Sequence, residues 1–314
     1  ISQVQLAQRG DAIRGDAWWL NLKRITATIL DRRTPVSEKK RFWLNTITTM
    51  EDAWLADDAI KAAISRFAAE QRIITNDDSE EPGWAQVTPD EEIVMFGDGS
   101  KSDDSTGLVG CRLSDGYVFQ IGVWQKPPGK RGDGWLAPRD AVDRRVHEAF
   151  ARFNIVAFWF DPSHTLDDED STRYWDGLID EWMRTHADRL PKEMWPVKSG
   201  MRNHAVMFDM TSPERQAMFV SAAMLFTEEL ETLNDVDEFA PEFEICGTAA
   251  LVKHMANARR APSKFGITLM KENRESMKKI DLAVCAVGAR MLRRIYLNTN
   301  VVTEPETGYE VWGV

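Results

Sequence analysis

The sequence contains little cysteine, no long apolar run and no glycine-rich phosphate-binding loop. Its three cysteines, Cys111, Cys246 and Cys285, lie far apart and form no C-x-x-C pair, so the sequence predicts neither a zinc site nor a disulfide framework. No stretch approaches the roughly 18 apolar residues of a membrane-spanning helix, and no signal-peptide pattern opens the chain. The P-loop motif G-x-x-x-x-G-K-[ST] is missing, so no nucleotide binding is expected in these residues. These absences favour a protein of a reducing cytosol.

Positive charge is also scarce, because 39 Lys and Arg face 50 Asp and Glu, a formal net charge of −11. The distribution is uneven. Residues 250–300 hold eleven basic and three acidic side chains, or +8, which leaves −19 on the remainder. A basic patch on an acidic body is compatible with phosphate binding, and a solvated helix face would give the same pattern.

The 314 residues are 43% hydrophobic and 28% charged, enough apolar material for a folded core. Residues 1–75 read as helical and rich in tryptophan, with an amphipathic helix at 57–72. An acidic, turn-rich linker follows at 76–90, and the main domain is expected at 91–314. The first residue is Ile1 rather than methionine, so we expect a segment of a longer protein.

The stretch 92–106 organises the main domain. An apolar run predicts a short buried strand at 94–96 that ends at Asp98, between two glycines that allow a sharp turn. This placement leaves the Asp98 carboxylate open to a metal or a phosphate. For Asp-Gly-Ser in isolation, an Asx-turn in a hairpin is the simpler interpretation.

The following residues predict two strands, a helix and another strand. Residues 107–113 and 117–124 alternate as strands, and the Asp115-Gly116 pair between them predicts a hairpin. A basic loop at 126–132 leads to a helix at 138–153. The apolar run 155–160 fits a strand covered on both faces, and it ends at Asp161 before a proline.

The last third is mainly helical. Helices are expected at 170–187, from the cap at 211–214 to about residue 233, at 248–257 and at 279–296, with a strand at 265–270. Asp281 lies in the first turn of the last helix, where an acid can also simply complement the helix dipole.

Three carboxylates, those of Asp98, Asp161 and Asp281, thus stand at the ends of predicted elements. Strand, strand, strand, helix, strand with acids at these places is the order of the ribonuclease H-like fold, a mixed central sheet flanked by helices. Carboxylates brought together repel, and hard divalent cations relieve that repulsion. The chain resembles the C-terminal nuclease half of the tailed-bacteriophage terminase large subunit. The matching stretches are FGDGSKSDDST at 96–106, FDP at 160–162, KKIDLA at 278–283, RFWLN at 41–45, EDAW at 51–54 and HMANARR at 254–260.

That resemblance implies a metal-dependent endonuclease that cuts concatemeric viral double-stranded DNA with two Mg²⁺ or Mn²⁺ ions. Asp98, Asp161 and Asp281 would be the catalytic metal ligands, with Asp98 bridging both ions. The implied partners are DNA, the terminase ATPase domain, the small terminase subunit and the portal, in the host cytoplasm. The P-loop ATPase half that precedes the nuclease in that family is not in this sequence.

Further residues have two interpretations each. Asp103 or Asp104 would hold a metal-bound water, or would belong to an acidic turn capping the next strand. His254 and Asn257, one helical turn apart, would approach DNA or form a buried structural pair. The candidates for phosphate contact are Lys198, Arg202, Arg259, Arg260, Lys271 and Lys279.

Two other functions compete with the nuclease. A sugar-kinase or actin-like ATPase would use the Asp98-Gly99-Ser100 turn as a phosphate loop, but it needs a second, similar hairpin, which the sequence lacks. A ribonuclease H-like module that only docks on DNA would not need all three acids.

Overall fold

The computed structural model describes residues 21, 23, 52–64, 83–163, 165–167, 172–191, 204–273 and 276–302. A four-stranded mixed sheet forms its centre, in the order β3-β2-β1-β4. The strands are β1 (Glu92–Asp98), β2 (Thr106–Arg112), β3 (Val118–Trp124) and β4 (Asn154–Asp161). β1 pairs antiparallel with β2 and parallel with β4, and β2 pairs antiparallel with β3. The strands predicted around Asp98 and before Asp161 are confirmed.

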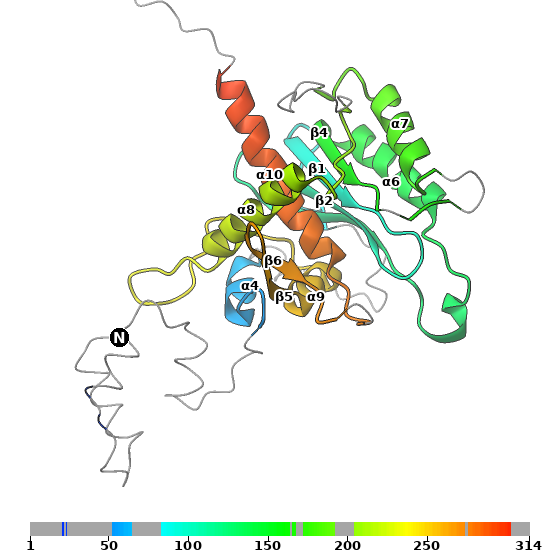
Figure 1. Ribbon diagram of the computed structural model, residues 1–314. Helices are drawn as coiled ribbons and strands as arrows, with labels where there is room; N and C mark the ends of the chain where they lie inside the picture. The colour runs from blue at the N-terminus through cyan, green and yellow to red at the C-terminus, as the bar shows by residue number, and fades with distance from the viewer. Residues whose placement is uncertain are drawn as a thin grey trace, which may run out of the picture.

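Helices cover both faces of this sheet (Figure 1). The crossover helix α6 (Arg139–Arg152) contacts β3 and β4 and lies beside α7 (Asp176–Thr185). On the opposite face, α10 (Asp281–Val302) packs on β1 and β2 and contacts α8 (Pro213–Leu230). The helix α9 (Ala249–Asn257) contacts α10 near its start. This arrangement is the mixed α/β, ribonuclease H-like architecture that the element order predicts.

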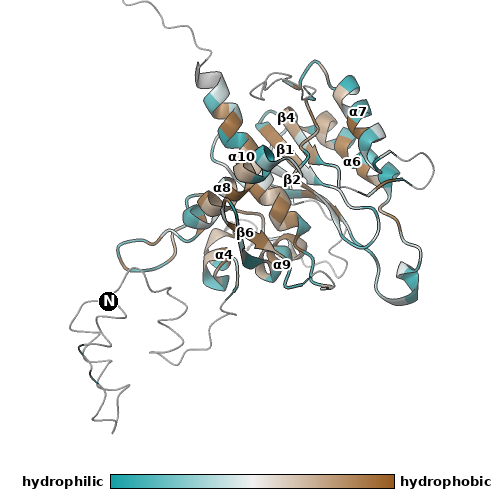
Figure 2. Ribbon diagram, in the orientation of Figure 1, coloured by the Kyte–Doolittle hydropathy of each residue, from teal (hydrophilic) through white to brown (hydrophobic). Residues whose placement is uncertain are grey.

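The central strands are buried because helices cover both sides of them. β1 is buried from Ile93 to Gly97, and Phe96 is fully covered by α10, where Gly288 allows the close approach. Figure 2 shows hydrophobic colours over β1, β4 and much of α10, and hydrophilic colours on the exposed side of α7. Continuous apolar runs in β1 and β4 therefore reflect two-sided burial, as expected for central strands.

Several boundaries differ from the sequence-based expectation. Residues 259–263 form a strand, β5 (Arg259–Ser263), which pairs with β6 (Gly266–Met270) and was not predicted because Pro262 argues against a strand. The helix expected from 170 begins at Asp176 among the described residues, and α8 ends at Leu230. The predicted helix 57–72 is described only as α4 (Asp57–Ala63); residues 65–72 lie outside the described part.

Residues 52–64 pack into the same core as the sheet. Trp54 is 1% exposed and stacks on Phe226 of α8, with ring centroids 5.4 Å apart. The Trp54 backbone N–H donates to the Ala258 carbonyl, and the Ile245 backbone N–H donates to the Ala63 carbonyl. This part of the region expected to be a helical linker is therefore attached to the domain that follows it.

Candidate active site

Asp98 and Asp161 end two neighbouring parallel strands at the same edge of the sheet. They are direct partners in the β1–β4 register, and the Gly99 N–H donates to the Asp161 carbonyl over 2.9 Å. Side chains at equivalent positions of paired strands point to the same face, so the two carboxylates are neighbours. The sequence-based prediction of two acids at one edge describes this arrangement.

Asp281 reaches the same edge from α10. Gly107 is the β2 partner of Asp98, and a Cβ added at Gly107 would lie 3.7 Å from the Asp281 backbone carbon. One turn later the Cys285 thiol donates to the Gly107 carbonyl over 3.4 Å. The small residue at 107 thus lets the first turn of α10 rest on the β1–β2 ladder beside Asp98.

Burial, followed by repulsion from neighbouring carboxylates, raises the pKa of all three acids. The pKa of Asp98 lies well above its usual range, through burial first and then through the charges of Asp281 and Asp161. Burial also raises the pKa of Asp161 to about 7, and burial followed by the charge of Asp104 raises that of Asp281 to about 7. At neutral pH this edge therefore holds protons unless cations replace them.

The donor set fits a hard divalent cation. Asp281 is 5% exposed, and its Oδ2 atom is buried without a hydrogen-bond partner. Carboxylate oxygens are the ligands that Mg²⁺ and Mn²⁺ prefer. Within the described ranges, however, no three or more His, Cys, Asp or Glu side chains already converge as a metal-binding group. The acids share one edge without forming a closed ion cage.

Asp104 and Asp103 lie in the β1–β2 turn and meet lysines from the segment before α10. Asp104 accepts a hydrogen bond from Lys271, and Lys279 Nζ lies 3.5 Å from Asp104 Oδ1. Burial acts to raise the pKa of Asp104, but the hydrogen bond and charge of Lys271 outweigh it, and the pKa is lowered. Asp103 pairs with Lys126 at 2.8 Å. Asp104 therefore stays ionised beside Asp281, while Asp103 faces solvent.

His254 and Asn257 support the start of α10. His254 is 1% exposed, and its Nδ1 accepts the Leu282 N–H over 3.1 Å, while burial lowers its pKa to about 3. The Asn257 side-chain amide donates to the Lys279 carbonyl over 3.0 Å. These contacts orient the turn that carries Asp281; His254 is buried and Asn257 is half-buried, and each contacts the segment at the start of α10.

The residues predicted to contact phosphate divide into those near the three acids, those that lie elsewhere, and those outside the described ranges. Lys271 and Lys279 lie at the acidic edge, whereas Arg259 donates to the Ala256 and Ala258 carbonyls. Arg260 donates to the Trp54 carbonyl and to Glu231. The structure does not bring these two arginines to the acids. Lys198 and Arg202 lie outside the described residues.

Sequence reasoning missed the charged groups around Asp161. Asp209 lies near enough to raise the Asp161 pKa, while the charges of Arg173 and Arg215 act to lower it. Arg173 binds Asp209 at 2.6 Å, and the Met210 N–H donates to Asp161 Oδ1 over 3.3 Å. The only sequence signal was the position of Asp209 just before the helix cap at 211–214.

Comparison with known proteins places the chain among phage sequences. No protein-family model matches it. It is 32% identical over 290 residues to the Gene 13 protein of Mycobacterium phage L5, and 33% identical over 287 residues to that of phage D29. The chain is a relative of phage proteins. Each alignment covers 90% of this chain, which spans 42% of the length of the relative.

Solved structures with a similar arrangement are phage terminases. The large terminase nuclease of thermophilic phage G20c with bound magnesium has 9% identity and a TM-score of 0.44, covering 77% of this chain and 97% of its own. The HK97 bacteriophage large terminase has 13% identity and a TM-score of 0.45, covering 86% of this chain and 50% of its own. Separately, no helix in the described ranges is both long and apolar enough to cross a membrane.

Proposed function

We propose that the chain is the nuclease part of a phage DNA-packaging terminase, a divalent-metal-dependent endonuclease that cuts concatemeric double-stranded DNA. The observation that carries this proposal is the gathering of Asp98, Asp161 and Asp281 at one sheet edge, from positions far apart in the sequence. Their raised pKa values mark a site where the nearby positive charges do not offset the effect of burial. Such perturbed acids concentrate where chemistry is performed.

Asp98, between the other two acids, would bridge two Mg²⁺ or Mn²⁺ ions, with Asp161 and Asp281 on either side. When bound, such ions supply an activated water and stabilise the leaving oxygen in phosphodiester hydrolysis. Asp161 and Asp281 would have to lose the protons of their carboxylic acid forms to hold such ions, so ion binding should tighten as pH rises through about 7. Lys271 and Lys279 hold Asp104 ionised at the same edge and are placed to meet a phosphate.

The wider assignment follows from the resemblance and from the greater length of the phage relatives. The ATPase domain, the small terminase subunit and the portal would be partners of the whole protein. Residues 91–314 would form the nuclease domain, and 1–75 would lead to it from the ATPase half.

The test is a plasmid-nicking assay with Mg²⁺ or Mn²⁺, combined with titration calorimetry of Mn²⁺ binding. Wild-type protein should nick and bind Mn²⁺, and Asp98→Asn should lose both. Asp235→Asn, which removes one exposed acid remote from the sheet edge, is the matched control and should retain both. Wild-type protein that binds no Mn²⁺ and leaves the plasmid intact would overturn the proposal. ADP binding by the same calorimetry would favour the actin-like alternative.

A further inference from the structure

The basic loop between β3 and α6, residues 125–138, contributes none of the three acids, but contacts at both of its ends connect it to the turn that follows Asp98. At one end of the loop, Lys126 binds Asp103 at 2.8 Å; at the other, the Ala137 N–H donates to the Lys101 carbonyl over 2.8 Å. Lys101 and Asp103 belong to the turn that directly follows Asp98. The base of the loop is therefore fixed to the segment that carries the candidate metal ligand.

The tip of the loop is a short, closed turn. Residues Gly129–Gly132 form a 3₁₀ helix; Gly129, its first residue, and Gly134, which follows it, adopt φ of +67° and +69°. Gly132 is buried against Pro127, whose carbonyl oxygen would lie 2.4 Å from an added Cβ. The Trp135 N–H donates to the Gly132 carbonyl over 3.2 Å. Such closure presents the tip in a defined conformation rather than as an open chain.

Two adjacent cations occupy this tip. Lys130 and Arg131 are exposed, and their side chains make no hydrogen bond or ion pair with the described residues. Asp133, also exposed, is the nearest acid in sequence. In Figure 1 the turn projects beyond the sheet, on the same lower side as the first turn of α10, and Figure 2 colours it hydrophilic. On a chain of net charge −11, these two exposed cations form a local patch of positive charge.

We infer that Lys130 and Arg131 contact the phosphate backbone of duplex DNA on one side of the cleavage site. The inference rests on the proposed nuclease function. Duplex DNA is favoured over an acidic protein because the loop is anchored to the turn after Asp98, where a bound phosphodiester would have to lie. A duplex extends well beyond the scissile phosphate, so a cationic tip whose base is fixed to the turn after Asp98 would meet the flanking phosphates. Phosphate contacts of this kind position a substrate without reading its sequence.

The experiment measures binding of a fluorescein-labelled DNA duplex by anisotropy in EDTA, at salt concentrations from about 50 to about 200 mM. Lys130→Gln/Arg131→Gln removes both charges and keeps side-chain length. The control, Lys61→Gln/Arg184→Gln, removes two exposed charges on α4 and α7. Two lost phosphate contacts should reduce the salt slope by about 1.8 and weaken binding by about tenfold or more. The control should change neither, and all variants should melt as wild type does.

Steady-state cleavage separates this inference from the proposed function. The loop variant should raise the KM for plasmid DNA, while Mn²⁺ binding by calorimetry stays as in wild type. An unchanged salt slope and KM, with Asp98→Asn still inactive, would overturn the loop contact and leave the nuclease standing. Unchanged DNA binding together with lost binding of poly-glutamate would assign the loop to an acidic protein and also overturn it. A wild-type chain that cuts no DNA would overturn the proposed function instead.

Discussion

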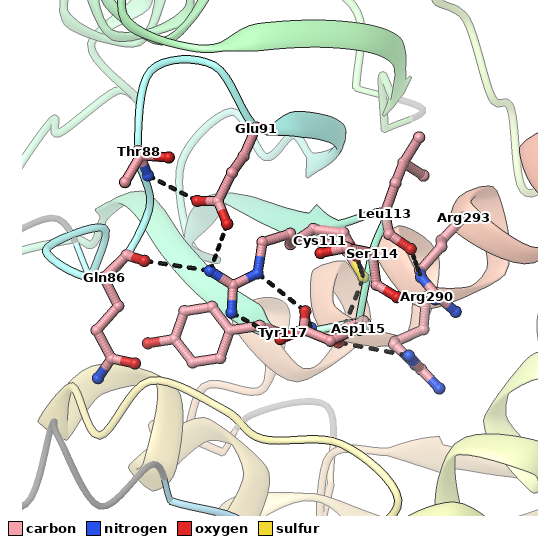
Figure 3. Close-up of polar contacts among 12 residues, drawn as sticks. Gln86, Thr88, Glu91, Cys111, Leu113, Ser114, Asp115, Tyr117, Arg290 and Arg293 are labelled. Atoms are coloured by element: carbon pink, nitrogen blue, oxygen red, sulfur yellow. Dashed lines mark hydrogen bonds and ion pairs between the residues drawn. The ribbon is translucent and has the colours of Figure 1, made fainter.

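The two ends of the central sheet differ in whether their acidic side chains are paired with basic ones. At the β2–β3 turn, Arg112 donates to both carboxylate oxygens of Asp115, at 2.9 and 2.7 Å, and to Glu91 at 2.8 Å (Figure 3). Burial acts to raise the pKa of Asp115, but the Arg112 hydrogen bond outweighs it and the pKa is lowered. At this end, acids are matched by arginines.

The same matching continues onto α10. Glu229 of α8 accepts hydrogen bonds from Arg290 and Arg294, each at 2.6 Å, and its pKa is lowered because these bonds outweigh burial. Arg293 donates to the Leu113 carbonyl over 2.9 Å, next to the hairpin turn (Figure 3). One helix, α10, is thus held by arginines near its middle and carries Asp281 at its start.

At the opposite end, Asp98, Asp161 and Asp281 have raised pKa values. Lys271 and Lys279 are held by Asp104, and Arg173 is held by Asp209, rather than by these three acids. The charges of the paired end are thus compensated within the fold, whereas the raised pKa values of the other end show that its ionised acids are disfavoured unless cations bind there. Local violations of charge matching of this kind are expected at functional sites.

The largest effect should come from Asp281→Asn at the unpaired end. If Asp281 holds a catalytic ion, plasmid cleavage should fall by about two orders of magnitude or more. The metal-free protein should melt at the same temperature or higher, because a buried charge is removed. Activity and melting temperature would be measured on one preparation.

An Asp281→Asn protein that is active but less stable would show that Asp281 only complements the helix dipole. That interaction contributes about 0.3–1 kcal/mol to the free energy of unfolding. Asn at the first turn of a helix is well tolerated, so the substitution leaves the packing of Leu282 and Ala283 in place.

The next effect should come from Glu229→Gln at the paired end. Arg290 is 5% exposed, and removing its carboxylate partner leaves a buried charge without compensation. Breaking such a pair should cost about 2–4 kcal/mol of unfolding free energy, measured by urea titration. Cleavage by the folded variant should match wild type. A full loss of cleavage without loss of stability would contradict the division between the two ends.

The stability of the metal-free protein should depend on pH because acids at both ends of the sheet have shifted pKa values. Asp161 and Asp281, with pKa values of about 7 in the folded state, bind protons more tightly folded than unfolded. Stability should therefore rise as pH falls from about 8 to about 5.5, by about 2 kcal/mol for each of the two groups and about 4 kcal/mol together. Below about pH 4 the sign reverses, because Asp115 and Glu229 have lowered pKa values and lose their arginine contacts when protonated. Saturating Mn²⁺ should abolish the gain on acidification, whereas a flat profile without metal would count against the raised values.

The sequence predicted the sheet and the acidic edge better than their surroundings. Apolar runs ending at Asp98 and Asp161 identify both strands because two-sided burial leaves a continuous hydrophobic pattern. The hairpin predicted from the Asp115-Gly116 pair is also confirmed. Gly116 adopts φ of +79°, a conformation that favours glycine, so the local sequence is enough to identify this turn.

What the sequence did not predict depends on contacts between distant segments. Arg259 and Arg260 lie in the basic segment, but β5 pairing directs them toward residues 52–54 and Glu231 rather than toward the acids. Asp104 accepts a hydrogen bond from Lys271, which lies 167 residues away in the sequence. Neither partnership leaves a local pattern, because the first depends on how β5 packs against residues 52–54 and α8, and the second on how the segment after β6 packs against the β1–β2 turn.

The smallest effect should come from Asp115→Asn, the exposed member of the paired end. Its side chain is 54% exposed, so losing the ion pair to Arg112 should cost at most about 1 kcal/mol. Part of that cost is offset, because an Asn oxygen can still accept the Tyr117 N–H. The net change in unfolding free energy should be about 0.5 kcal/mol, with cleavage unchanged. Since the lost contact is screened, the difference from wild type should shrink in about 1 M salt. A loss as large as that of Glu229→Gln would show that the hairpin turn, and not the Glu229 cluster, holds this end of the sheet together.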